Sequence, residues 1–126
     1  MIADSSFLVA LFHPEDELHG KAVSDFSASE ATITVPDRVV EEVLTVFSYL
    51  DGWGAAMEVL AKILSNRRFE VRHLPEREWA EVARFSNSVA KKLSFTDYLV
   101  LYLSSKEGAA PLAYDRQLLK AAKTKR

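Results

Sequence analysis

The chain has 126 residues, of which 48% are hydrophobic and 27% are charged, and its formal net charge is −2. These values fit one compact domain over residues 1–126 with a sizeable core, and they exclude a disordered chain. Cysteine is absent, which excludes disulfides, thiolate catalysis and cysteine-bound zinc. No apolar run approaches the roughly 20 residues of a membrane span, and no basic segment precedes Asp4. We therefore expect a soluble, cytoplasmic protein without a membrane segment.

The first half of the chain alternates short apolar runs with amphipathic segments. Pro14 interrupts the first helical pattern, because proline lacks the backbone donor that a helix interior needs. Pro36 stops a β-branched run, and Asp37 can cap the helix that follows. The patterns predict a strand over 1–3, helices over 5–12 and 15–27, a strand over 31–35, a helix over 37–50, a turn over 51–54 and a helix over 55–64.

The second half continues the same alternation. Pro75 suits the first turn of a helix, where its missing N–H would be unpaired in any case. Ser94 and Asp97 have the spacing of a capping box, in which each side chain bonds the other's backbone. The patterns predict a strand over 69–73 and a helix over 75–90, then a helix over 95–107, a strand over 110–114 and a helix over 115–122. This alternation indicates an α/β fold, a parallel sheet flanked by helices.

Four acidic residues lie far apart in the sequence, each close to the start of a predicted helix: Asp4, Glu42, Asp97 and Asp115. Asp4 and Asp115 directly follow strands, and the carboxyl ends of parallel strands share one edge of a sheet. Glu42 lies in the second turn of a helix that starts from the same edge. Carboxylates that meet in a cleft repel one another, and a hard divalent cation relieves that repulsion. The pattern predicts metal-assisted phosphodiester hydrolysis with Mg²⁺ or Mn²⁺.

Each of these acids also has a structural interpretation. Asp4, Asp97 and Asp115 can all serve as helix caps, which are common roles for aspartate. Glu42 is different, because it lies on the flank of the apolar face that contains Val39. A carboxylate there needs a metal or an ion pair with a neighbouring Arg or Lys.

Four short segments resemble, in order, the motifs of PIN-domain ribonucleases. They are Asp4–Ser6, Pro36–Leu44 with Glu42 in the acidic position, Leu93–Asp97 and Pro111–Asp115. Together they cover nearly the whole chain at similar spacing. The subgroup with the greatest resemblance is the small stand-alone PIN proteins of prokaryotes, many of which are VapC-type toxins.

The resemblance implies a three-layer α/β/α sandwich with a short central parallel sheet. It also implies an Mg²⁺- or Mn²⁺-dependent endoribonuclease that cleaves single-stranded RNA, the toxin of a toxin–antitoxin pair with an antitoxin protein as partner. The metal-binding and catalytic acids would be Asp4, Glu42, Asp97 and Asp115, with Ser6 as a further catalytic polar residue. The sequence departs from the family pattern in two places. Ala113 stands where Thr or Ser is frequent in the family, and no strand is predicted after the last helix.

Two alternatives remain from the residues themselves. One is a catalytically degenerate PIN-like module that binds RNA or protein, and the other is a phosphatase or receiver-like α/β domain.

Basic clusters could hold phosphates, and Trp53 and Trp79 could stack on bases or pack in the protein. An apolar stripe could form a homodimer face, a higher homo-oligomer contact or an antitoxin groove. The basic clusters are Arg67–Arg68 with Arg72, Lys91–Lys92 and Lys120–Arg126, and the stripe is Met57, Leu60, Ile63 and Leu64.

Overall fold

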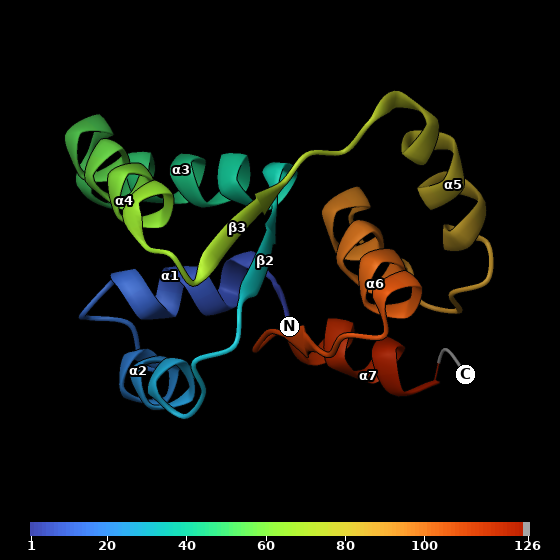
Figure 1. The fold of residues 1–126 in the computed structure, drawn as a ribbon, viewed down its shortest axis with the longest axis horizontal. Coiled ribbons are helices and arrows are strands. Elements are labelled where there is room, and N and C mark those ends of the chain that lie inside the picture. The colour runs from blue at the N-terminus through green and yellow to red at the C-terminus, as the bar shows by residue number, and fades with distance from the viewer. Residues whose placement is uncertain (125–126) are drawn as a thin grey trace.

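A computed structural model describes residues 1–124, with four strands and seven helices in that range (Figure 1). Lys125 and Arg126 of the expected basic C-terminal cluster lie outside the described residues. The elements are β1 (Ile2–Ala3), α1 (Ser5–Phe12), α2 (His19–Ser27), β2 (Ile33–Pro36), α3 (Asp37–Asp51), α4 (Trp53–Ser65), β3 (Phe69–Arg72), α5 (Glu76–Ser86), α6 (Phe95–Glu107), β4 (Pro111–Leu112) and α7 (Arg116–Thr124).

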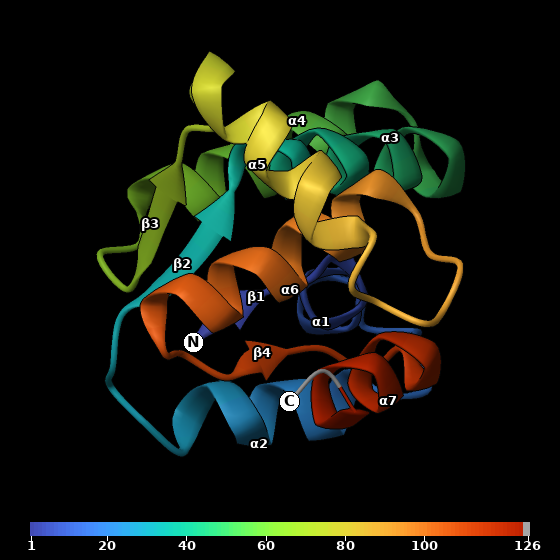
Figure 2. The ribbon, with the colours of Figure 1, turned by 90° about the vertical axis from the view of Figure 1, so that its right-hand side faces the viewer.

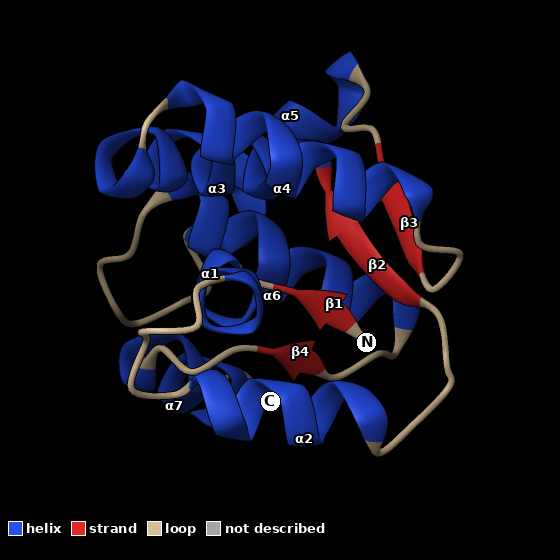
Figure 3. Ribbon diagram, turned by 90° about the vertical axis from the view of Figure 1, so that its left-hand side faces the viewer, coloured by secondary structure: helices blue, strands red, loops and turns tan. Residues whose placement is uncertain are grey.

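The strands form one parallel sheet in the order β3-β2-β1-β4 (Figure 3). Helices α1, α3 and α4 lie on one side of β2 and β3, and α5 and α6 lie on the other (Figure 1). Because every strand runs in the same direction, all four carboxyl ends reach one edge of the sheet. The predicted three-layer α/β/α sandwich is therefore confirmed.

The core is built from two kinds of helix. Helix α3 buries one face against the sheet, through Val39, Val43 and Phe47. Helix α6 is different, because five consecutive residues from Leu99 to Leu103 are buried. It is covered by β1 and β4 on one side and by α5 and α7 elsewhere, as Figure 2 shows. A helix that is apolar around its circumference belongs in such an enclosed place.

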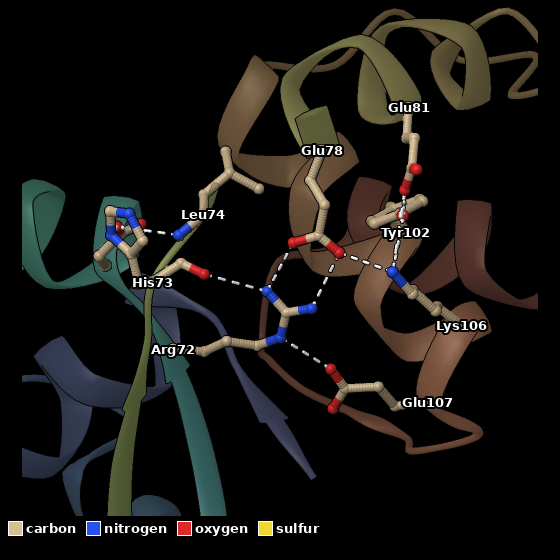
Figure 4. A network of polar contacts seen from close by, with 9 residues as sticks. Arg72, His73, Leu74, Glu78, Glu81, Tyr102, Lys106 and Glu107 are labelled. Atoms are coloured by element: carbon tan, nitrogen blue, oxygen red, sulfur yellow. Dashed lines mark hydrogen bonds and ion pairs between the residues drawn. The ribbon is translucent and has the colours of Figure 1, made fainter. Parts of the chain in front are cut away.

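Helix α5 is attached to α6 and to β3 by ion pairs of one buried carboxylate with two partly exposed cations (Figure 4). Glu78 is 1% exposed, and its two carboxylate oxygens accept from Arg72 at 2.8 and 2.9 Å. Lys106 donates a third bond of 2.7 Å to the same carboxylate. These charged hydrogen bonds hold the pKa of Glu78 well below its usual range, at about 2. The pairs connect the end of β3 with two helices.

Several local predictions differ from the structure: β2 is Ile33–Pro36 rather than 31–35, and β4 is only Pro111–Leu112 rather than 110–114. Helix α2 begins at His19 rather than residue 15, because Asp16 forms a turn in which it accepts the N–H of Leu18. Helix α5 ends at Ser86 rather than residue 90, where the N–H of Asn87 bonds back to the preceding turn. Asp37 lies within α3 and does not cap it; its Oδ2 instead accepts from the N–H of Leu74 at 3.1 Å.

Helix boundaries elsewhere agree closely with the predicted ones. Asp4 caps α1, as expected, and its side chain accepts from the N–H of Ser6. Helix α4 starts at Trp53, two residues early, after Gly52 adopts a positive φ of 91° that favours glycine. Within residues 1–124, no helix combines the length and apolar character needed to cross a membrane.

Candidate active site

The topology brings the loops after β1 and β4 together. The chain runs outward from β1 through β2 to β3 and then returns to β4 on the other side of β1. The order of the strands therefore reverses between β1 and β4, and α/β proteins bind ligands at the carboxyl ends of strands where such a reversal occurs. Asp4 and Asp115 follow these two strands, and the N–H of Asp4 bonds Leu112 O at 3.0 Å.

Asp4 is a buried carboxylate with one unpaired oxygen. Its side chain belongs to a residue that is only 3% exposed, and Oδ2 accepts from the Ser6 N–H at 3.2 Å and the Ser6 hydroxyl at 2.7 Å. Oδ1 is shielded from solvent and has no hydrogen-bond partner among residues 1–124. Burying such an oxygen is costly unless a cation or donor satisfies it.

Ser6 connects Asp4 to the opposite loop. While its hydroxyl donates to Asp4, the same oxygen accepts from the N–H of Tyr114 at 2.9 Å. Tyr114 is held in turn, because its hydroxyl donates to Asp25 on α2 at 2.6 Å. The residue before Asp115 is thus fixed both to α1 and to α2.

Glu42 and Asp97 lie within electrostatic reach of Asp4. Partial burial is the main cause that raises the pKa of Glu42, and the charges of Asp4 and Asp97 raise it further. Burial likewise raises the pKa of Asp97, with Asp4 and Asp115 adding to the effect, while Ser94 opposes it. Pairwise charge effects therefore connect Asp4 with Glu42 and Asp97, Asp97 with Glu42, and Asp115 with Asp97.

The structure also shows the capping roles. Ser94 and Asp97 form the predicted capping box, with the Asp97 N–H donating to Ser94 Oγ at 3.1 Å and Asp97 Oδ2 accepting from the Ser94 N–H at 3.3 Å. Asp115 Oδ1 accepts from the N–H groups of Gln117 and Leu118 at 2.9 and 3.1 Å. Each cap engages one carboxylate oxygen, and no hydrogen bond to the other oxygen is formed within residues 1–124. A cap and a ligand role are therefore compatible for both residues.

Glu42 does not form the ion pair that was its structural alternative to metal binding. Within residues 1–124 it forms no ion pair with Arg or Lys, since the nearby Arg38 pairs with Glu41 at 3.2 Å instead. Its carboxylate is partly buried beside other acids, with the Ser5 side chain as its hydrogen-bonding neighbour. Repulsion among these acids favours a bound cation over an ion pair as the reason for this position.

The four acids have the oxygen donors that a divalent cation prefers, but they do not surround a single ion with a complete set of protein ligands. All are oxygen donors, which Mg²⁺ and Mn²⁺ prefer, and Asp4 Oδ1 is unpaired. No group of three acidic or histidine side chains within residues 1–124 is close enough to hold one ion directly. Mg²⁺ usually keeps several waters and uses one or two carboxylates, so an open arrangement suits it.

The expected basic clusters divide into structural and exposed residues. Arg72 is engaged by Glu78 and by Glu107, the latter at 2.9 Å, and is therefore unsuited to holding phosphate. Arg68 donates to the carbonyls of Ala31 and Phe26 and lies over the Phe26 ring. Both arginines are thus part of the fold, whereas Arg67 is exposed at the opposite edge of the sheet, just before β3.

The apolar stripe on α4 is partly covered. Ile63 is fully buried and Met57 packs against the core, whereas Leu60 is half-buried and Leu64 is 65% exposed. One side of the stripe therefore belongs to the core, and its use as a protein contact stays a prediction. Trp53 remains exposed, and Trp79 packs by stacking on Phe95 with ring centroids 4.9 Å apart.

Sequence patterns did not single out Arg38, the cation that shares a groove with an acid of the site. That groove is lined by Arg38, Glu41, Glu42, Thr45, Val46 and Thr96. The available signal was its position four residues before Glu42, which places both side chains on one helix face. A second groove lies at the other edge of the sheet, near Gly108 and α7, and none of the four acids lines it.

Comparison with known proteins places this geometry in a family. The PIN domain matches residues 1–124. Among solved structures, VapC20 of Mycobacterium tuberculosis, described as a sarcin-ricin loop cleaving toxin, superposes with a TM-score of 0.85 at 21% identity, covering 95% of this chain and 93% of that one. PAE2754 from Pyrobaculum aerophilum gives a TM-score of 0.67 at 23% identity, covering 97% and 84%. No curated protein matches. The chain belongs to the PIN-domain family.

Proposed function

We propose that this protein is an Mg²⁺- or Mn²⁺-dependent endoribonuclease that cleaves single-stranded RNA. Its family and its similarity in fold to VapC20, a toxin that cleaves the sarcin-ricin loop, support this class of activity. The observation that carries the proposal is Asp4: a buried carboxylate with an unpaired oxygen, set among three further acids. Asp4, Glu42, Asp97 and Asp115 are the proposed metal ligands and catalytic acids, with Ser6 as a positioning residue.

The chain's own residues prepare the site in a specific way. Ser6 binds Asp4 Oδ2 through two hydrogen bonds and thereby leaves Oδ1 as the oxygen available to a ligand. Asp97 and Asp115 each keep one oxygen on a helix cap, which fixes the orientation of the carboxylate. A bound divalent cation would supply Lewis-acid chemistry toward a phosphodiester and acidify water. The acids would remain ionised when a cation offsets their mutual repulsion.

We further propose a toxin role with a protein antitoxin, in the cytoplasm, and a homodimeric or higher homo-oligomeric state. The support is the fold shared with VapC20. Exposed apolar residues toward the end of α3 and the start of α4 offer surface for such contacts, with Tyr49 at 86% and Trp53 at 63% exposure. Light scattering of the purified chain tests the oligomeric state, and co-expression with the protein of a neighbouring gene tests the antitoxin.

The decisive experiment is cleavage of a single-stranded RNA in Mg²⁺, Mn²⁺ or EDTA, with Asp4→Asn and Asp97→Asn beside the wild type. We expect cutting that needs the metal and that both variants lose while remaining folded. Equal cutting by Asp4→Asn would remove Asp4 from the site. Cutting that persists in EDTA would exclude the metal mechanism.

A second candidate is a catalytically degenerate module that binds RNA or protein. Two observations favour it: no three potential ligands within residues 1–124 are close enough to hold one ion, and Ala113 supplies no hydroxyl two residues before Asp115. Calorimetric titration with Mn²⁺ separates the candidates. Binding that Asp4→Asn abolishes supports the nuclease, and no binding supports the degenerate module.

A further inference from the structure

A groove lies along the start of α3, beside the acidic site. Glu42 is one of its lining residues, so the groove reaches one of the four acids. Thr96, the residue before Asp97, lines its other side, which places the groove between α3 and the start of α6. Its volume of 440 Å³ lies within the roughly 300–1,000 Å³ typical of ligand sites. A group of nucleotide size can therefore lie beside the proposed cleavage site.

Arg38 is the cation among the residues that line this groove. Its guanidinium lies over the Trp79 ring, 4.9 Å from the centroid. Trp79 is held in place by Phe95, with an interplanar angle of 20° between the two rings. Stacking of this kind orients the planar guanidinium before any ligand binds, which lowers the entropy lost on binding.

The present partners of Arg38 do not satisfy its donors. Its ion pair with Glu41 joins side chains that are 39% and 71% exposed, and such pairs contribute little to stability. Arg38 Nε is shielded from solvent and donates to no acceptor within residues 1–124. An oxyanion that displaced Glu41 could bind two guanidinium N–H groups side by side, a geometry that matches phosphate.

We infer that Arg38 binds the RNA phosphate adjacent to the scissile one, and that the groove between α3 and α6 carries the RNA strand away from the acidic site. This inference rests on the proposed ribonuclease function. It assigns Arg38 to substrate binding rather than to the chemical step, because its guanidinium pairs with Glu41 and stacks on Trp79 and contacts none of the proposed metal ligands within residues 1–124. Its loss should therefore weaken RNA binding more than it slows turnover.

The test measures binding and cutting separately. Fluorescence anisotropy with a labelled single-stranded RNA in EDTA, over a series of salt concentrations, gives affinity without cleavage. For Arg38→Ala we expect roughly tenfold weaker binding at low salt, since a charged hydrogen bond is lost. We also expect a salt slope smaller by about 0.7, the value for one phosphate contact on a single strand. Arg38→Lys should recover part of the affinity, because lysine keeps the charge but not the planar fork.

Arg67→Ala is the matched control, since Arg67 is an exposed arginine at the opposite edge of the sheet. It should change neither affinity nor slope by a comparable amount. Equal effects of the Arg38 and Arg67 substitutions, or an unchanged slope for Arg38→Ala, would overturn the inference while leaving the ribonuclease intact. Wild-type binding that depends on Arg38 without metal-dependent cutting would overturn the proposed function and, with it, the position beside a scissile phosphate, and would leave only RNA binding by Arg38. An absence of RNA binding by the wild type would overturn the inference as well.

Discussion

Ser6 donates its hydroxyl proton to Asp4 at 2.7 Å and, with the same oxygen, accepts the backbone N–H of Tyr114 at 2.9 Å. Residues separated by 108 positions in the chain are thereby joined at the carboxyl edge of the sheet. The hydrogen bond from Ser6 to Asp4 Oδ2 leaves Oδ1 as the unpaired oxygen of Asp4. The hydrogen bond from the Tyr114 N–H to Ser6 sets the position of the loop that carries Asp115. The geometry of the acidic site therefore depends on a neutral side chain.

Replacing Asp4 by Asn should abolish RNA cleavage while the fold remains. The amide keeps the size of the side chain and can still accept from Ser6, but it removes the charge that would bind a cation. We expect the cleavage rate to fall by more than about a hundredfold. Even the substitution of residues that hydrogen-bond to metal ligands lowers metal affinity or activity by about 10–100-fold. Initial cleavage rates and thermal melting by circular dichroism measure the two effects. Glu58→Gln on the exposed side of α4 is the control and should cut at the wild-type rate.

Replacing Ser6 by Ala should reduce activity without abolishing it. Asp4 would lose a hydrogen bond to Oδ2, and the N–H of Tyr114 would lose its acceptor. We expect activity to fall about 10–100-fold and the free energy of unfolding to fall by about 1–3 kcal/mol. Urea denaturation and the Mn²⁺ concentration needed for half-maximal cleavage give the two values. A variant that needs no more Mn²⁺ than the wild type would show that Ser6 does not position Asp4.

Replacing Glu42 by Gln should stabilise the metal-free protein while it impairs cleavage. The folded-state pKa of Glu42 is raised, so above that pKa its ionised form destabilises the fold, and stability is recovered as the pH falls through it. Removing the charge should therefore raise the free energy of unfolding at neutral pH by about 0.5–2 kcal/mol. Melting curves with and without Mn²⁺ test this, and the increase in melting temperature caused by Mn²⁺ should shrink in the variant. If Glu42→Gln melted at a lower temperature than the wild type in EDTA, the destabilising role assigned to the Glu42 charge would be wrong.

Replacing Glu78 by Gln should weaken the attachment of α5 to α6. The buried carboxylate holds Arg72 and Lys106, whose charges would be left without their partner. We expect a loss of about 2–3 kcal/mol, allowing for screening of the partly exposed partners. Because the folded pKa of Glu78 is lowered to about 2, its contribution is complete above the ordinary value near 4.5 and disappears as the pH falls toward 2.

Urea denaturation between neutral and acidic pH measures this contribution. The difference between wild type and Glu78→Gln should be largest near neutral pH and should vanish at the acidic end. Glu76→Gln, an exposed acid on the same helix, is the control and should leave the pH dependence unchanged. An equal pH dependence for the wild type and Glu78→Gln would contradict the role assigned to the ion pairs.

Much of the fold follows from local patterns in the sequence. The alternation of short β-branched runs with amphipathic segments predicted the parallel α/β sandwich, because periodicities of about two and 3.6 residues decide which face of each element is apolar. Caps were also readable, as the box formed by Ser94 and Asp97 shows. Asp4, Glu42 and Asp115 could be assigned to one edge of the sheet, since parallel strands end together, whereas Asp97 follows a loop and had no such local signal. Errors occurred at helix ends such as His19 and Ser86, where turn-forming hydrogen bonds outweigh the periodicity.

Contacts between distant segments were decided only by the tertiary structure. No local pattern indicates that Ser6 bonds Tyr114, that Glu78 engages Arg72, or that Arg38 lies over Trp79. The reason is physical. Long side chains such as those of Arg38, Arg72 and Glu78 can reach several partners, and Ser6 lies far from Tyr114 in the sequence. The packing of the helices on the sheet determines which partner each side chain meets. The sequence by itself determined the family fold and the positions of Asp4 and Asp115 just after two parallel strands. The tertiary structure decided which oxygen of Asp4 is unpaired and which arginine adjoins the acids.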